Sequence, residues 1–244
     1  MNDDDFTRTL TVAWTGASGF PYGLRLLEML LAARVRVWLL YTSAAQIVAK
    51  QELGLTLPAQ ASALEAWLLA RFTPLPGQLR VFGQQEWFAP MASGSNPGDA
   101  MIVCPCTMGA LAAIAHGMAD NLLERAADVM LKERRPLILV PRETPFSAIH
   151  LEHMLKLARL GVVILPPNPA FYHHPQQVSD LVDFVVARIL DHVQVPHQLM
   201  QRWGAQWPVA SQPMSSAVAD AEAADNADQR LSVHDQKSAI TPAR

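Results

Sequence analysis

The stretch Leu10-Thr-Val-Ala-Trp-Thr-Gly-Ala-Ser-Gly-Phe-Pro-Tyr-Gly23 predicts a β-strand, a turn of small residues and the first turn of a helix. The apolar run Leu10–Thr15 is typical of a buried strand, and Pro21 suits a first helical turn, where its missing N–H costs no hydrogen bond. Such a turn directs backbone N–H groups at the space beyond the strand, which favours a phosphate. We interpret Gly16–Gly19, with the hydroxyl of Ser18, as a candidate nucleotide or flavin phosphate site. Its Gly-x-x-Gly spacing matches neither a dinucleotide fingerprint nor a Walker loop, so a tight turn with nothing bound is the alternative.

Apolar, strand-like runs alternate with helix-period segments along the rest of the chain. The expected strands are Leu10–Thr15, Val35–Thr42, Ala100–Cys104, Leu137–Pro141 and Val162–Leu165. The expected helices are Tyr22–Ala33, Ala63–Phe72, Met108–His116, Asn121–Lys132, Ser147–Leu160 and Val178–Val193. This alternation indicates an α/β fold with a parallel sheet covered on both faces. Ligands bind beyond the carboxyl ends of such strands, so the candidate loops are Gly16–Gly19, Thr42–Ala45, Pro105–Gly109, Arg142–Pro145 and Pro166–His174.

The composition excludes several classes of partner. Half of the 244 residues are apolar and the net charge is only −3, so neither nucleic acid nor an anionic membrane is expected as a partner. No apolar run is long enough to span a membrane, and the acidic start lacks the features of a signal peptide, so we expect a cytoplasmic protein. The two cysteines, Cys104 and Cys106, are expected to be reduced. No further ligand lies at a suitable local spacing, so no metal is expected.

The ends of the chain differ from its middle. We predict an acidic N-terminal extension over residues 1–8 and one folded domain over residues 9–208. Ala, Ser, Asp and Gln dominate residues 209–244, which show no sustained apolar periodicity. We predict a disordered tail there, with partial ordering against a neighbouring subunit as the alternative.

Charged and aromatic residues in three segments suggest chemistry. Arg142-Glu143 follows a buried strand, where arginine can bind phosphate bidentately and a carboxylate of tuned pKa can transfer protons; an Arg–Glu pair that closes the loop is the alternative. The run Lys132–Arg135 is usually a solvated helix end. Phe171-Tyr172, within the proline-rich segment Pro166–Pro175, suits an apolar substrate with a polar end, or a rigid surface loop without function. Thr107 is a site hydroxyl or only the cap of the next helix.

A set of motifs resembles the UbiX flavin prenyltransferases over about Leu10 to Trp203. The motifs are Thr15-Gly-Ala-Ser-Gly19, Cys104-Pro-Cys106, Asn121-Leu-Leu-Glu-Arg-Ala-Ala-Asp128, Leu131-Lys-Glu-Arg-Arg-Pro-Leu137, Pro141-Arg-Glu-Thr-Pro145 and Pro169-Ala-Phe-Tyr-His173. The resemblance implies a flavodoxin-like, Rossmann-like three-layer sandwich that assembles as a dodecamer with FMN between subunits. It also implies metal-independent transfer of a dimethylallyl group from dimethylallyl phosphate to N5 and C6 of reduced FMN. The product, prenylated FMN, is the cofactor of UbiD-type decarboxylases, including the one in ubiquinone biosynthesis.

The resemblance further implies roles for individual residues. Those implied to bind the cofactor are Gly16, Ala17, Ser18, Thr42, Cys106, Thr107, Met108, Gly109 and Arg125. Those implied to bind the donor phosphate are Lys132, Arg142, Tyr172 and Arg188. The implied catalytic residues are Glu143 for proton transfer, Ser18 near N5, and Lys132. Trp87 and Trp203 are candidate walls of the prenyl pocket.

The sequence departs from the family pattern at two positions and leaves two other functions open. Thr42 stands where the family commonly has Ser and keeps the hydroxyl, whereas Phe20 replaces a small residue and is expected to crowd the prenyl pocket or to point into the subunit interface. An FMN-dependent cysteine decarboxylase is the first alternative function, although Pro105-Cys-Thr-Met-Gly-Ala110 differs from the Pro-Ala-Ser-Ala-Asn-Thr-type loop of that family. A non-catalytic flavin carrier is the second. A carrier has no need of all five residues Lys132, Arg142, Glu143, Tyr172 and Arg188.

Overall fold

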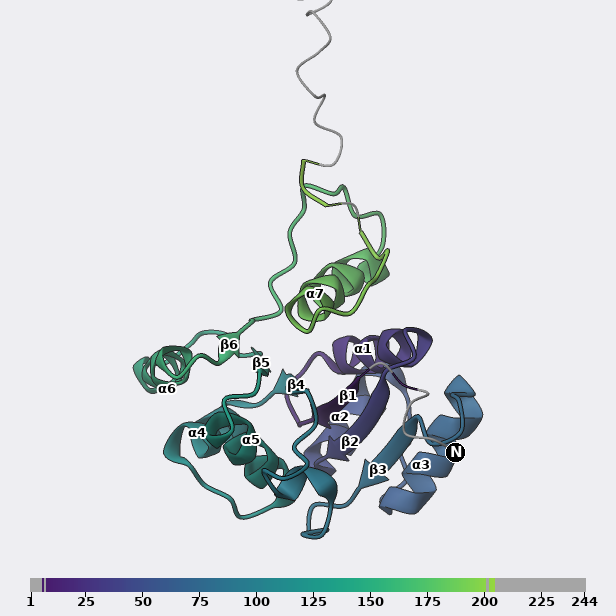
Figure 1. The fold of residues 1–244 in the computed structure, drawn as a ribbon. Helices are drawn as coiled ribbons and strands as arrows, with labels where there is room; N and C mark the ends of the chain where they lie inside the picture. The colour runs from purple at the N-terminus through teal and green to yellow at the C-terminus, as the bar shows by residue number, and fades with distance from the viewer. Residues whose placement is uncertain (1–5, 7, 201, 205–244) are drawn as a thin grey trace, which may run out of the picture. The chain divides into compact units, whose positions relative to one another are not determined.

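A six-stranded parallel sheet forms the centre of the computed structural model, which describes residue 6, residues 8–200 and residues 202–204. The strands are β1 (Thr9–Trp14), β2 (Arg36–Tyr41), β3 (Leu79–Phe82), β4 (Ala100–Cys106), β5 (Leu137–Pro141) and β6 (Val163–Ile164). Their order in the sheet is β3-β2-β1-β4-β5-β6 (Figure 1). The chain therefore builds outward from β1 in one direction, returns, and builds in the other direction from β4.

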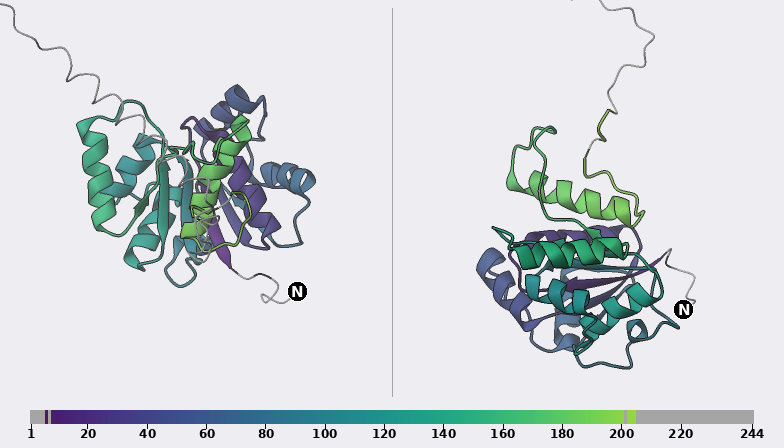
Figure 2. Two further views of the ribbon diagram at one scale, coloured as in Figure 1. Left: turned by 90° about the horizontal axis from the view of Figure 1, so that it is seen from above. Right: turned by 90° about the vertical axis from the view of Figure 1, so that its left-hand side faces the viewer.

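Helices cover both faces of the sheet (Figure 2). They are α1 (Phe20–Ala32), α2 (Ser43–Leu53), α3 (Ala61–Phe72), α4 (Met108–His116), α5 (Leu122–Lys132), α6 (Ala148–Arg159) and α7 (Val178–His192), with a short 3-10 helix, η2 (Pro90–Ala92). Buried side chains of α1, α2, α3 and α7 share one apolar cluster with alternate strand residues such as Val12 and Trp14. Those of α4, α5 and α6 share the other cluster, with Ala13 and Val103. The predicted three-layer α/β sandwich is confirmed.

An ion pair joins α1 to its neighbour α7 on one face of the sheet. Nε of Arg25 on α1 lies 2.7 Å from Oδ1 of Asp183 on α7, and Nη2 lies 3.3 Å from the other carboxylate oxygen. The hydrogen bonds to Asp183 raise the pKa of Arg25 further above its ordinary value. Arg8, directly before β1, donates to the carbonyl of Val193, directly after α7. The end of α7 therefore lies near the edge of the sheet at which β1 begins.

The predicted elements agree with the observed ones to within a few residues, but β3 and α2 were not predicted. β3 has only four residues, of which Arg80 is exposed, so it gives little apolar signal. α2 buries only Ala45 and Ala49, small side chains that leave no strong helical periodicity. Short edge strands and helices that pack through alanine are weak signals in sequence alone.

The chain divides into two units, residues 1–201 and residues 202–244, and of the second the structure describes only residues 202–204. The predicted tail, residues 209–244, lies outside the described residues, as does most of the predicted N-terminal extension. Among the described residues, every helix is too short or too polar to cross a membrane.

Phe20 occupies the apolar core, which corrects the expectation that it crowds the prenyl pocket or points into a subunit interface. Its side chain is fully buried, and its ring meets that of Trp14 edge-on, with 4.9 Å between centroids. Position 20 is the first residue of α1, where the helix crosses the end of β1. A large side chain there fills the space between helix and sheet.

Replacing Phe20 with alanine is therefore expected to lower the free energy of unfolding by about 3–5 kcal/mol, because a buried ring is lost and a cavity remains. Urea unfolding followed by circular dichroism measures the change. Phe88→Ala is the matched control, since Phe88 is fully exposed and should change stability little. Equal stability losses in the two variants would contradict the placement of Phe20.

Candidate cofactor site

The loops that follow β1 and β4 meet at the point where the sheet changes its direction of growth. β1 pairs with β2 on one side and with β4 on the other, so the connections after these strands diverge at this point. The hydroxyl of Thr15 joins the two loops: it donates to the carbonyl of Pro105 at 2.7 Å and accepts from the N–H of Thr107 at 2.9 Å. Open parallel sheets bind ligands at such a switch point, beyond the carboxyl ends of the strands.

The N-terminus of α1 holds a carboxylate of the chain itself. The N–H groups of Gly19 and Phe20 donate to Glu52, at 3.0 Å and 2.8 Å. Gly19 is the N-cap residue, with a φ of 112° that favours glycine, and it supplies no side chain to cap the helix. The sequence predicted a phosphate here, whereas this terminus holds the carboxylate of Glu52, which a phosphate placed there would have to displace.

Two further helix N-termini lie at the same edge of the sheet, each capped by a threonine. Oγ1 of Thr42 accepts from the N–H of Ala45 at the start of α2, and Oγ1 of Thr107 accepts from the N–H of Ala110 at the start of α4. The capping role that the sequence suggested for Thr107 is therefore observed. Each hydroxyl still has a hydrogen to donate, which suits a phosphate oxygen.

Two glycines show where a bulky group has room. A Cβ built on Gly109, in the first turn of α4, would meet only Oγ1 of Thr107, at 4.0 Å. A Cβ on Gly16 would instead clash with the side chain of Ala44, because the turn after β1 packs directly on α2. Open space therefore lies over α4 rather than over α2. Small residues, capped N-termini and neighbouring cations at this edge fit a phosphorylated planar cofactor such as FMN.

The two cysteines of β4 are buried and free. Burial raises the pKa of Cys106 to about 12 and also raises that of Cys104. Sγ of Cys106 lies 3.5 Å from the carbonyl of Thr107, and its side chain packs in the core against the α4 face. Cys106, predicted to bind the cofactor, is thus fully buried in this chain, and its carbonyl accepts from the N–H of Arg142.

Arg142 and Glu143, directly after β5, lie at the same edge as Ser18. Nε of Arg142 donates to the carbonyl of Ser18 at 3.4 Å, and its backbone N–H donates to the carbonyl of Cys106 at 3.3 Å. Both side chains are exposed, and the carboxylate of Glu143 accepts from the N–H of Thr144. The structure therefore brings Arg142, of the Pro141–Pro145 motif, to the predicted flavin loop, and Glu143 is the next residue in the chain.

Arg125 and Lys132 lie on α5, and neither contacts this edge directly. Nε of Arg125 donates to the carbonyl of Ala92 at 3.0 Å, and its Nη1 pairs with Asp128 at 2.8 Å. Lys132 ends α5 shortly before β5 begins, so it lies near the opposite, amino edge of the sheet. There it pairs with Glu133, whose pKa it lowers by hydrogen bonding.

The remaining predicted residues lie on and before α7. Arg188 pairs with Asp191 at 2.6 Å, toward the end of α7 that lies near the amino edge. Tyr172 precedes α7, is about half exposed, and contacts the rings of His173 and Phe184. Among the described residues, the structure shows no contact between Lys132 or Arg188 and the Gly16–Gly19 turn. One chain therefore does not assemble all the predicted donor-binding residues.

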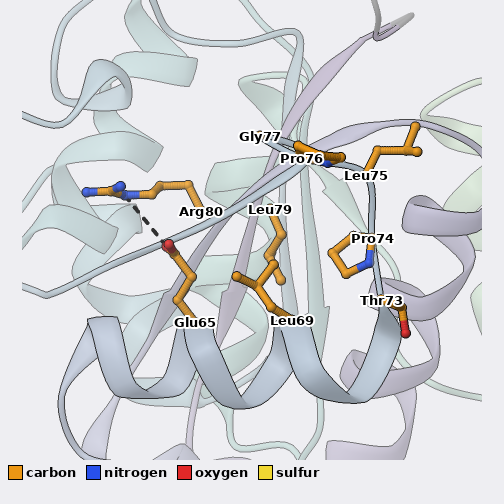
Figure 3. A pocket seen from close by; sticks show the side chains of 9 residues that line it. All are labelled: Glu65, Leu69, Thr73, Pro74, Leu75, Pro76, Gly77, Leu79 and Arg80. Carbon is orange, nitrogen blue, oxygen red and sulfur yellow. Dashed lines mark ion pairs between the residues drawn. The ribbon is translucent and has the colours of Figure 1, made fainter.

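Both tryptophans proposed as walls of the prenyl pocket are exposed. Trp87 follows β3 and is partly exposed, and Trp203 is an exposed residue of the second unit. Figure 3 shows a pocket between α3 and the start of β3, crossed by the 3.6 Å ion pair of Glu65 and Arg80. It opens near the amino edge of β3, away from the candidate site.

Comparisons with known proteins define the class of this one. The family model described as Flavoprotein matches residues 1–190. Flavin prenyltransferase UbiX of Pseudomonas aeruginosa is 55% identical over 203 residues, which are 83% of this chain and 97% of that protein. A solved dodecameric FMN-dependent UbiX-like decarboxylase from Escherichia coli O157:H7 is 44% identical, with a TM-score of 0.69 over 80% of this chain and 98% of its own. A structure of AnUbiX (PadA1) in complex with FMN and dimethylallyl pyrophosphate is 40% identical, with a TM-score of 0.71 over 80% and 97% of the two chains.

Fold, site and family model together define a flavoprotein of the flavodoxin-like α/β class. Within that class, the chain belongs to the UbiX flavin prenyltransferase family. The resemblance drawn from the motifs is confirmed.

Sequence reasoning missed two residues of the site, Thr15 and Glu52. Thr15 begins the motif Thr15–Gly19, but the sequence does not show which groups its hydroxyl binds. Glu52 lies in α2, which was not predicted, so no pattern connected it with the turn after β1. The one available signal was the buried strand end itself, where a threonine must find hydrogen-bond partners.

Replacing Thr15 with valine is expected to lower the free energy of unfolding by about 1–3 kcal/mol, because two buried backbone groups lose their partner. Thr11→Val is the matched control: Thr11 is also buried on this strand, and its hydroxyl has no hydrogen-bond partner among the described residues. That variant should be as stable as the parent or more so. If Thr15→Val and the parent had the same free energy of unfolding in urea, the role of this hydroxyl in joining the two loops would be contradicted.

The buried thiols predict slow alkylation in the folded protein. At about pH 8, iodoacetamide should leave Cys104 and Cys106 unmodified until urea unfolds the chain, because only the thiolate reacts. Raised pKa values also mean that the folded state keeps protons that the unfolded state releases above roughly pH 8.5, so stability falls as the pH rises through this range. Mass spectrometry of the native and unfolded protein checks the first point. Rapid labelling of native Cys106 would refute it.

Proposed function

We propose that this chain is a flavin prenyltransferase that transfers the dimethylallyl group of dimethylallyl phosphate to N5 and C6 of reduced FMN. Membership in the UbiX family supports the reaction class. The observation that carries the residue assignment is the contact of Arg142 with the Ser18 carbonyl. This contact supports the assignment, because Arg142, which we propose binds phosphate, lies beside the turn that is proposed to hold the flavin, and Glu143 follows it in the chain.

FMN, when bound, supplies the nucleophilic atoms of this reaction. The backbone around Gly16, Ala17 and Ser18 would hold its ring, over the open space at Gly109. The hydroxyl of Thr42 would donate to its phosphate at the N-terminus of α2. With the phosphate at α2, Glu52 stays hydrogen-bonded at the N-terminus of α1, as a second carboxylate beside Ser18.

Cleavage of the donor's C–O bond leaves negative charge on phosphate and positive charge on the allyl group. Cations held in a site stabilise the departing phosphate more than water does. Arg142, Lys132 and Arg188, with the phenol of Tyr172, are proposed to do so. Glu143 would take or return the proton that accompanies phosphate departure or ring closure.

A neighbouring subunit is proposed to complete the site. Ser18, Arg142 and Glu143 lie at the carboxyl edge of the sheet, whereas Lys132 and Arg188 lie toward the amino edge of the same chain. Residues separated in this way can act on one substrate when subunits pack edge to edge. We propose a dodecamer with FMN between subunits; the solved Escherichia coli relative, described as dodecameric, supports this assembly.

The product would serve a UbiD-type decarboxylase, in ubiquinone biosynthesis or related aromatic acid decarboxylation. The cysteine decarboxylase alternative is not favoured, because the relatives at 43–55% identity are named flavin prenyltransferases. A non-catalytic flavin carrier would leave the cations and Glu143 without a purpose. The cytoplasmic location expected from the sequence stays a prediction.

The reaction is tested anaerobically with purified protein, dithionite-reduced FMN and dimethylallyl phosphate or diphosphate. Mass spectrometry of the released flavin should show a species heavier by one C5H8 unit. Glu143→Gln should lower kcat/KM by about 10²–10⁴-fold, the usual contribution of a proton-transfer group. Glu152→Gln, on the exposed face of α6, is the control and should behave as the parent.

Two results would count against the proposal. Tightly bound FMN that neither donor alkylates would leave a flavin carrier or a decarboxylase. Full activity of Glu143→Gln would remove Glu143 from the catalytic residues without affecting the reaction class.

A further inference from the structure

The carboxylate of Asp191 connects two side chains at the end of α7 and just beyond it. Its Oδ2 accepts from Nη1 of Arg188 at 2.6 Å, and its Oδ1 lies 3.2 Å from Nε2 of His197. The N–H of Leu199 donates to Nδ1 of the same imidazole at 3.4 Å. Because Nδ1 accepts, Nε2 carries the hydrogen and donates it to Asp191. The hydrogen bonds thus link Leu199, His197, Asp191 and Arg188 in sequence.

Exposure increases along this series. The side chain of His197 is 4% exposed, that of Asp191 23% and that of Arg188 48%. A fixed imidazole therefore holds one oxygen of a half-buried carboxylate, and the other oxygen holds a solvent-facing arginine. Among the described residues, Asp191 accepts from Nη1 of Arg188 and from none of its other donors. The planar guanidinium keeps donors on Nη2 and Nε, which can bind a phosphate.

We propose that Asp191 is a positioning residue for the donor phosphate, through Arg188, and that His197 fixes Asp191. The proposal rests on the proposed function, in which Arg188 binds the phosphate of dimethylallyl phosphate. Neither Asp191 nor His197 belongs to the motifs that carry the family resemblance.

Asp191 has two effects on phosphate binding, and they have opposite signs. Holding the guanidinium still removes rotamer freedom that binding would otherwise have to freeze, which strengthens binding. A negative charge beside the phosphate repels it, which weakens binding. Because the carboxylate is anchored by a buried imidazole and Arg188 is long and exposed, we infer that orientation outweighs repulsion. The sign of the change in Asp191→Asn decides between the two.

Calorimetric titration of the FMN-loaded, oxidised protein with dimethylallyl phosphate measures binding without turnover. Asparagine keeps the shape of Asp191 but has one carbonyl oxygen, which cannot serve both Arg188 and His197. Asp191→Asn should raise the Kd roughly three- to tenfold, the cost of ordering one long side chain. With reduced FMN, KM for the donor should rise by a similar factor while kcat changes little.

Asp183→Asn is the matched control. Asp183 lies on the same helix, its side chain is also 23% exposed, and it also binds an arginine, at 2.7 Å. Its loss should lower the Tm but leave the Kd unchanged. His197→Gln keeps a side-chain N–H for Asp191 and should bind the donor nearly as the parent does, whereas His197→Leu should resemble Asp191→Asn.

Several outcomes would overturn the proposal. A Kd that is unchanged or lower in Asp191→Asn would mean that the carboxylate only neutralises Arg188. An equal rise in Asp183→Asn would mean that α7 as a whole had loosened. In an Arg188→Ala background, Asp191→Asn should add nothing; a further loss there would show an action not exerted through Arg188. An unchanged Kd in Arg188→Ala would also overturn it. If the parent failed to prenylate FMN, the proposed function would be wrong, but the Kd values for dimethylallyl phosphate could still be measured and compared.

Discussion

The hydroxyl of Thr15 is the interaction on which the candidate site depends. It joins the loops after β1 and β4, the two strands between which the sheet changes direction, through hydrogen bonds to Pro105 and Thr107. Thr107 in turn caps α4, so one buried hydroxyl determines where that helix begins. Without this link, the turn after β1 and the N-terminus of α4 would be free to separate. The candidate site is thus built from strand ends that the chain itself holds together.

Three helix N-termini lie at this edge of the sheet, and they differ in what caps them. The termini of α1, α2 and α4 all present N–H groups beyond the carboxyl ends of the strands, and each end carries partial positive charge. The chain satisfies the α1 terminus with its own carboxylate, Glu52, and the other two with neutral threonine hydroxyls. Phosphate binding is cheaper at a neutral cap, because no bound anion has to leave.

Features of the fold and site that depend on neighbouring residues in the chain could be predicted from sequence, whereas contacts between distant segments could not. Continuous apolar strands gave the sheet, and motif resemblance gave the family, because both signals are local in the chain. Phe20 was misplaced, since sequence position does not tell whether the first residue of a helix faces the core or a ligand. Glu52 was missed because its contact with Gly19 joins segments 33 residues apart and lies on a helix with a weak pattern. Arg188 could be named from the family resemblance, but its connection to Asp191 and His197 could not.

The separation of the predicted cations is a constraint on how such an enzyme can work. Arg142 leaves β5 at one edge of the sheet, and Lys132 approaches the start of β5 at the other. A parallel strand keeps its two ends apart by its own length, so rotamer changes cannot bring both side chains to one small phosphate. Either one of the two does not bind the donor, or a second chain supplies it. Both residues belong to motifs that resemble the family, which favours the second explanation. Under that explanation, the donor phosphate binds only in the assembled protein. The assembly would then be part of the active site. Arg188, which Asp191 holds at the end of α7, would bind the substrate of a neighbouring subunit.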